Sequence, residues 1–170
     1  MRRDPASLGI IDPVSGQRWL VECTPSFPRQ ARRLDAEQPE LAGRIDGILL
    51  THAHIGHYAG LIHLGREVMG VDGVPVHAMP RMEKFLRTQG PWSQLVGLKN
   101  IALRPMRDGR AFALNERLQV TPFLVPHRDE FSETVGFRIE GQRQKILWLP
   151  DIDKWGRWKT PLEKALVGVD

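Results

Sequence analysis

The stretch LLTHAHIGHYAGL, residues 49–61, decides the expected fold because it places three histidines directly after a short apolar run. That run, IDGILL at 45–50, predicts a β-strand that is buried on both faces. His52, His54 and His57 then lie in the loop at the carboxyl end of the strand, where open α/β sheets usually place their chemistry. Half of the 6 histidines of the chain are in this loop, and this clustering predicts a shared function for them.

On both sides of the loop, the sequence predicts strands with interspersed helices. Residues 7–12 and 18–23 flank a turn-forming segment and predict a β-hairpin. Helical patterns cover 28–44 (interrupted or restarted at Pro39), 57–70, 80–90, 91–98 and 160–168. Strand patterns cover 74–79, 100–106, 111–114, 118–127 and a hairpin over 133–151 that turns at Gly141. This order predicts an α/β fold of mixed sheets covered by helices. Without a linker or repeat, we expect residues 1–170 to form a single domain.

Composition narrows the class of protein. The chain is 41% hydrophobic and 26% charged, which is ordinary for a globular protein. It has no run of about 18 apolar residues, the least that a membrane-spanning helix needs. Asp4 and Pro5 interrupt the segment where a signal peptide would need an apolar core, so we expect a cytoplasmic protein. The single Cys23 excludes an intramolecular disulfide and a cysteine-based zinc cluster.

The net charge of +4 comes from scattered arginines rather than from a basic run. This distribution argues against nucleic acid as a partner and favours a small-molecule substrate.

Two more polar positions follow predicted strands and extend the histidine cluster. His127 comes after an apolar run, and Asp151 emerges beyond LWLP. Neutral imidazoles bind zinc, iron or copper, and three of them with a carboxylate satisfy a tetrahedral or five-coordinate ion. Asp151 either binds the metal or accepts the N–H of a ligand histidine, whereas a turn aspartate is the simpler interpretation of Asp153. The predicted metal ligands are therefore His52, His54, His57, His127 and Asp151, with a capped core histidine as the alternative for His127 and a helix-cap or turn aspartate as the alternative for Asp151.

The remaining residues of interest have plainer interpretations. His63 and His77 are expected on a helix surface and in a strand. Trp148, Trp155 and Trp158 are expected to pack in the core or to wall an apolar pocket.

The segment HAHIGH resembles the His-x-His-x-Asp-His loop of the metallo-β-lactamase fold superfamily. The segments TQGPWSQLV (88–96), VPHRDEFSETVGF (125–137) and LPDIDKW (149–155) are similar to the branch that contains pyrroloquinoline quinone biosynthesis protein B. The resemblance runs from about Ser7 to the last residue. It implies an αββα sandwich of mixed sheets covered by helices. The chain is short at both ends for this family, so we expect an incomplete sandwich whose exposed sheet edge favours a homo-oligomer.

By this resemblance, His52, His54 and His127 hold the first metal, with Asp151 alongside or bridging, and His57 belongs to a second site. Gly56 stands where the family has its aspartate, which removes a ligand of that second site. We therefore expect one divalent ion, zinc first, with iron or manganese as alternatives.

The resulting functional hypothesis is a metal-dependent hydrolase in which metal-activated water attacks an ester, lactone or phosphodiester bond. The catalytic residues would be His57, as general acid or base if it binds no metal, and Asp151. Arg128 is a further candidate for holding an anionic substrate. The alternative is a metal-binding accessory or carrier protein of weak or no catalytic activity, such as one in cofactor biosynthesis.

Overall fold

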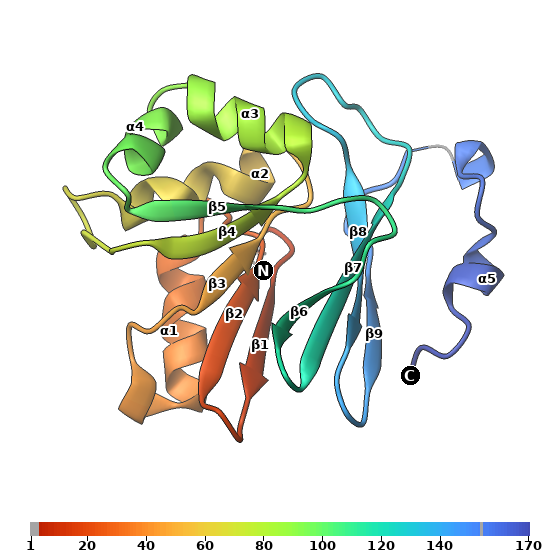
Figure 1. Ribbon diagram of the computed structural model, residues 1–170, viewed down its shortest axis with the longest axis horizontal. Coiled ribbons are helices and arrows are strands. Elements are labelled where there is room, and N and C mark those ends of the chain that lie inside the picture. The colour runs from red at the N-terminus through yellow and green to blue at the C-terminus, as the bar shows by residue number, and fades with distance from the viewer. Residues whose placement is uncertain (1–3, 154) are drawn as a thin grey trace.

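Two β-sheets stack face to face in the computed structural model, which describes residues 4–153 and 155–170 (Figure 1). The first sheet has the order β1-β2-β3-β4-β5, and the second has the order β6-β7-β8-β9. In the first sheet β1 is antiparallel to β2 and the other pairs are parallel. The second sheet is antiparallel throughout. The predicted α/β sandwich is therefore confirmed.

The strands of the first sheet are β1 (Leu8–Asp12), β2 (Gln17–Val21), β3 (Gly47–Leu49), β4 (Val74–Ala78) and β5 (Ile101–Pro105). Those of the second are β6 (Phe112–Asn115), β7 (Leu118–Leu124), β8 (Val135–Glu140) and β9 (Lys145–Trp148). The helices are α1 (Phe27–Glu37), η1 (Pro39–Leu41), α2 (Ile55–Tyr58), η2 (Ala59–Leu64), α3 (Pro80–Thr88), α4 (Trp92–Gly97), η3 (Trp155–Arg157) and α5 (Leu162–Ala165). Among the described residues, no helix combines the length and apolar character that crossing a membrane requires.

Alternation along β3 explains how the layers are joined. Ile48 points into an apolar cluster beneath the helices, with Leu61, Leu64 and Met82 among its members. Leu49 points the other way, into the cluster between the two sheets. Because successive side chains of a strand face opposite sides, one short apolar strand contributes to both cores, as its sequence predicts.

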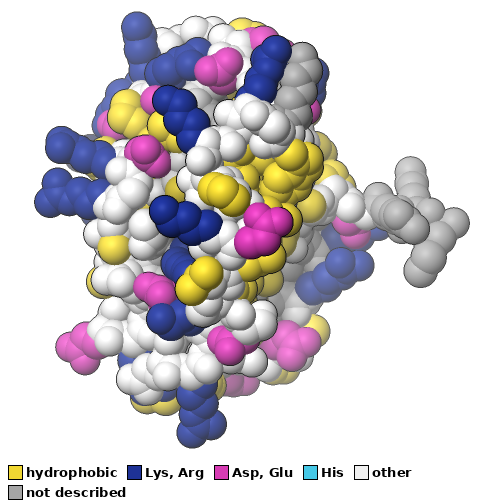
Figure 2. Space-filling view, turned by 90° about the vertical axis from the view of Figure 1, so that its right-hand side faces the viewer, with side chains coloured by type: hydrophobic (Ala, Val, Ile, Leu, Met, Phe, Trp, Pro, Cys, Tyr) yellow, Lys and Arg dark blue, Asp and Glu magenta, His cyan; other side chains and the backbone are white. Residues whose placement is uncertain are grey.

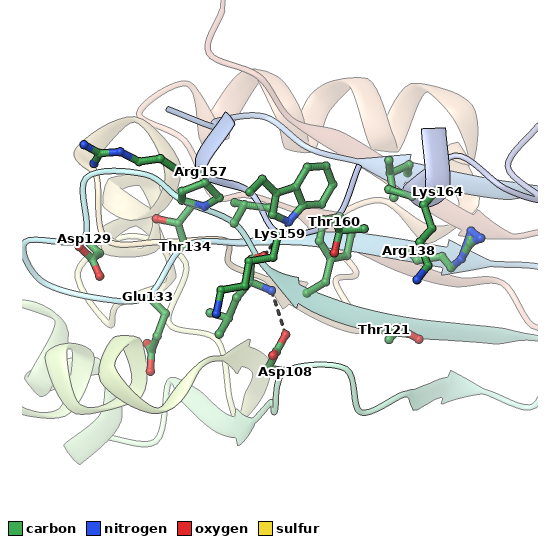
Figure 3. A pocket seen from close by; sticks show the side chains of 17 residues that line it. Asp108, Thr121, Asp129, Glu133, Thr134, Arg138, Arg157, Lys159, Thr160 and Lys164 are labelled. Carbon is green, nitrogen blue, oxygen red and sulfur yellow. Dashed lines mark hydrogen bonds between the residues drawn. The ribbon is translucent and has the colours of Figure 1, made fainter. Parts of the chain in front are cut away.

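The two outer faces of the sandwich are covered unequally. Helices α1 to α4 lie over the first sheet, whereas the second sheet has the C-terminal segment with η3 and α5 on its outer side (Figure 1). Hydrophobic side chains gather around a hollow on that side (Figure 2). The hollow is a groove of about 840 Å³ with Phe123, Leu147 and Trp158 in its walls and Arg138 and Lys164 toward one end (Figure 3). Of the three tryptophans considered, only Trp158 lines this groove; Trp148 packs against the inter-sheet core.

Two predicted helices are shorter than expected. The pattern over 57–70 predicts one helix, but η2 ends at Leu64 and Val68 is 63% exposed. The chain turns there, with Gly70 at a φ of 55° that side-chain-bearing residues rarely adopt. The helix expected over 160–168 is reduced to α5. The restart at Pro39 and the turn at Gly141 are confirmed.

Candidate metal centre

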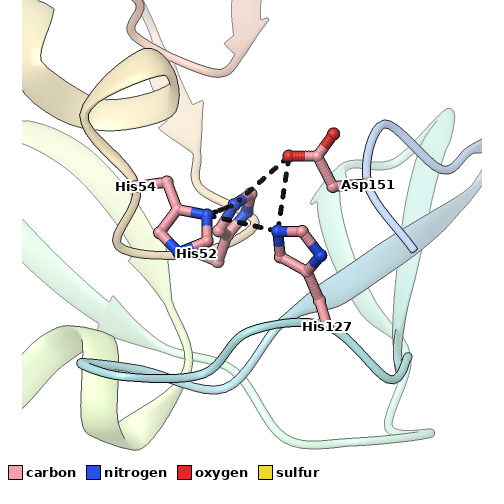
Figure 4. A group of neighbouring side chains, drawn as sticks. All are labelled: His52, His54, His127 and Asp151. Atoms are coloured by element: carbon pink, nitrogen blue, oxygen red, sulfur yellow. Dashed lines mark hydrogen bonds and ion pairs between the residues drawn. The ribbon is translucent and has the colours of Figure 1, made fainter. Parts of the chain in front are cut away.

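Strand ends from both sheets bring four of the predicted ligands together. His52 and His54 follow β3 in the first sheet, while His127 follows β7 and Asp151 follows β9 in the second (Figure 4). One ligand atom from each of these residues lies within 4.8 Å of the other three. The cluster therefore sits at one end of the sandwich, over the seam between the sheets.

The spacing of the four atoms matches a metal site. His52 Nε2 lies 2.8 Å from His54 Nδ1 and 3.4 Å from Asp151 Oδ2. His127 Nε2 lies 3.2 Å from His54 Nδ1 and 3.7 Å from Asp151 Oδ2. Ligand atoms at about 2.0 Å from a tetrahedral zinc ion are roughly 3.3 Å apart, within the observed span.

The hydrogen bonds of His52 and His54 outside the cluster determine which ring nitrogen carries the proton and which carries the lone pair. Thr51 Oγ1 donates its proton to Glu22, so at 2.9 Å it accepts from His52 Nδ1. Glu130 Oε2 lies 2.9 Å from His54 Nε2. Because a carboxylate only accepts, it fixes the proton of His54 on Nε2. The inward nitrogens of His52 and His54 then carry lone pairs that converge with His127 Nε2 and a carboxylate oxygen, and this donor set fits a cation.

Electrostatics keep His52 in the form that a metal requires. The side chain is buried, and burial, reinforced by the neighbouring His57 and His54 imidazoles, lowers its pKa to about 2. Removing an imidazolium from water and placing it beside other cations is unfavourable. His52 is therefore a neutral imidazole in the folded protein.

His57 stands beside the four-residue cluster, between two carboxylates. Its Nε2 lies 3.1 Å from Asp151 Oδ2, and its Nδ1 lies 3.3 Å from Glu22 Oε1. Burial lowers the pKa of His57, but Glu22 and Asp151 together outweigh burial and raise that pKa above its ordinary value. The structure thus links His57 to the cluster through Asp151 while leaving it outside the group of four.

Glu22 is a site residue that the sequence interpretation missed. Its side chain is completely buried at the end of β2, and burial raises its pKa against the opposing effect of His57. Its backbone has a φ of 71°, a conformation that costs a non-glycine residue about 1 kcal/mol or more. An acidic residue in the apolar run RWLVEC was the available signal.

Backbone contacts hold the histidine loop against neighbouring elements. Cys23 N donates to His57 O at 2.8 Å, and Gly60 N donates to Cys23 O at 2.9 Å. A Cβ at Gly60 would lie 2.1 Å from Thr24 O, so only glycine fits there. On the other side of the loop, Ala53 N donates to Ser132 Oγ at 2.8 Å.

Position 56, where the family has an aspartate, has free space around it. A Cβ at Gly56 would meet nothing within 4 Å, so the glycine is not required by crowding. Among the described residues, His57 and Asp151 are the predicted ligands left for a second ion.

Asp153 does more than the predicted turn. Its Oδ2 lies 3.2 Å from His127 Nδ1, and its N–H donates to Pro126 O at 2.7 Å. Arg128 is exposed beside His127, and its charge contributes to the lowered pKa of His52. His63 stacks on Phe27 away from the cluster, with ring centroids 5.8 Å apart.

The fold and the site define a class of protein. The family model described as "Beta-lactamase superfamily domain" matches residues 17–170. The chain therefore belongs to the beta-lactamase superfamily, as the HAHIGH segment predicted.

Particular relatives refine this assignment. The chain is 31% identical over 173 aligned positions to coenzyme PQQ synthesis protein B of Xanthomonas campestris pv. campestris (strain B100), covering 88% of this chain and 53% of that protein. It is 28% identical over 153 positions to ribonuclease Z of Bradyrhizobium sp. (strain ORS 278), covering 84% of this chain and 46% of that protein. The chain thus spans about half the length of the curated relatives it matches. These similarities support the predicted branch.

Solved structures agree on the fold. Zn²⁺-bound PqqB from Methylobacterium extorquens superposes with a TM-score of 0.70 at 20% identity, over 88% of this chain and 54% of that one. A diphosphatase of the PhnP family superposes with a TM-score of 0.60 at 24% identity, over 81% and 50%.

Proposed function

We propose that this chain binds one divalent metal ion, zinc first, with iron or manganese as alternatives, and that it hydrolyses an ester, lactone or phosphodiester bond of a small molecule. The observation that carries the proposal is the convergence of His52 Nε2, His54 Nδ1, His127 Nε2 and Asp151 Oδ2 within 4.8 Å. Three imidazoles and one carboxylate are a zinc-type donor set.

The comparisons support metal-dependent hydrolysis as the reaction class. One structural neighbour is described as Zn²⁺-bound and another as a diphosphatase. Two curated relatives are ribonucleases Z. The scattered basic residues argue against RNA as the substrate of this chain. Because two relatives are ribonucleases, the substrate panel should still include an RNA oligonucleotide.

The residues around the cluster have separate proposed roles. When bound, a divalent ion would acidify water and polarise the bond to be cleaved. Asp151 would either bind the ion or orient the attacking water, because its Oδ2 faces both the imidazoles and His57. His57 would move a proton at Nε2, with Glu22 holding the opposite side of its ring. A direct bond from His57 to metal stays a prediction.

The first test is the metal content of protein purified without added metal or chelator, followed by a panel of ester, lactone, phosphodiester and RNA substrates. Elemental analysis should find about one ion per chain, and His127→Ala should lose most of it. His63→Ala is the matched control, because His63 packs on Phe27 outside the cluster. Equal metal content in wild type and His127→Ala would refute the proposed site.

A metal-binding accessory protein is the second candidate function, and Gly56 is the observation that favours it. Without a carboxylate at this position, the second ion lacks a ligand. Full metal occupancy with no turnover of any substrate in the panel would support this alternative. The expected single domain over 1–170, cytoplasmic location and homo-oligomer stay predictions; sedimentation at several concentrations tests the last.

A further inference from the structure

Two carboxylates outside the ligand set contact ligand histidines from behind. Glu130 Oε2 lies 2.9 Å from His54 Nε2, and Asp153 Oδ2 lies 3.2 Å from His127 Nδ1. Both contacts are to the ring nitrogen that faces away from the cluster. The two side chains are 50% and 46% exposed, so neither is needed to fill the core.

The hydrogen bond to Glu130 decides which nitrogen His54 presents to the cluster. A carboxylate accepts and cannot donate, so the nitrogen facing it must carry the proton. His54 then presents an unprotonated Nδ1 to the cluster. Asp153 lies at ion-pair distance from His127 Nδ1 without forming a hydrogen bond to it, so the tautomer argument applies to His54 alone. If Glu130 is removed, no other hydrogen bond to His54 Nε2 holds the ring in this tautomer, among the residues described.

The loop that carries Glu130 is anchored independently of Glu130. Arg81 lies 3.3 Å from Asp129 Oδ2 and donates to Asp129 O at 2.8 Å. Ser132 accepts from Ala53 N at 2.8 Å. The segment 125–134 should therefore keep its course when the Glu130 carboxylate is lost.

We propose that Glu130 is a positioning residue, which fixes the orientation and tautomer of His54 and so sets the affinity of the cluster for metal. The inference rests on the proposed metal binding. Partners behind metal-ligating histidines change metal affinity by about 10–100-fold when removed. We expect a loss of this size in Glu130→Ala.

The experiment measures zinc affinity by competition with a chromogenic chelator and the tautomer of each histidine by ¹H–¹⁵N NMR of metal-free protein. Glu130→Gln keeps a carbonyl acceptor and should retain most of the affinity. Asp129→Ala is the matched control, because it removes the neighbouring carboxylate, which contacts Arg81 and no imidazole. In Glu130→Ala, the NMR spectrum should show His54 as a mixture of tautomers.

The outcomes separate the two proposals. Wild-type affinity and a single His54 tautomer in Glu130→Ala, with metal bound normally by wild type, would overturn the positioning role alone. An equal loss of affinity in Asp129→Ala would also overturn it, because general disturbance of the loop would then explain the effect. A wild-type protein that takes up no zinc would overturn the metal site and the positioning role together.

Discussion

Gly56→Asp should convert the site from one metal ion to two. The residue lies in α2, and a Cβ there meets nothing within 4 Å, so the new Cβ collides with nothing. The structure now offers a second ion His57 and Asp151, whose facing atoms are 3.1 Å apart. An aspartate at position 56 adds a third protein ligand, the usual number in a catalytic zinc site.

The measurement is zinc per chain by elemental analysis after dialysis against zinc. We expect wild type to hold about one ion and Gly56→Asp about two, since three protein ligands with water complete a tetrahedral site. The matched control is Gly97→Asp in α4, where a Cβ also meets nothing within 4 Å. It adds the same charge away from the cluster and should leave the zinc content at the wild-type value.

A content that stays at one ion in a folded Gly56→Asp protein would refute this reasoning. The new aspartate side chain would then point away from the second ion, or that ion would need a further ligand that these residues do not supply. Circular dichroism and thermal melting identify a folded variant.

Three further predictions concern stability. Burial lowers the pKa of His77 to about 4 from its ordinary 6.5; because the unfolded chain takes up this proton first as the pH falls, His77 should cost the fold up to about 1.4 kcal/mol per pH unit between these values. Urea unfolding should show that the free energy of unfolding falls less between pH 7 and pH 5 in His77→Gln than in the wild type. Equal falls in the two proteins would contradict the prediction. Gly60→Ala should destabilise by about 1–3 kcal/mol or more, because its Cβ would lie 2.1 Å from Thr24 O; an unchanged urea midpoint would show that the backbone adjusts freely. Ser132→Ala leaves the buried Ala53 N–H without its partner and should cost about 1–3 kcal/mol in the same assay, whereas a neutral effect would mean that another group replaces the hydroxyl.

The three histidine ligands could be predicted from the sequence because each of them follows the end of an apolar strand. His52 and His54 follow β3, and His127 follows β7. Strand ends are readable from local pattern, and the HAHIGH spacing adds a family resemblance that the match over 17–170 confirms.

The groups behind the ligands could not be found in this way. Glu130 meets His54 across 76 positions of sequence, and Glu22 meets Thr51 across 29. Such pairs depend on how loops of different strands fold over one another, and no local pattern records that. The end of η2 at Leu64 was missed for a related reason, since a periodic apolar pattern does not reveal that the chain turns before Gly70.

The origin of the ligands has a consequence for the unfolding of the protein. The first sheet is built from residues before 106 and the second from residues after 111, so His52 and His54 belong to one half of the chain and His127 and Asp151 to the other. An ion held by all four would act as a reversible crosslink between two consecutive halves. Separating the sheets would then require releasing the ion, so metal supply would govern the mechanical cohesion of the sandwich as well as its chemistry.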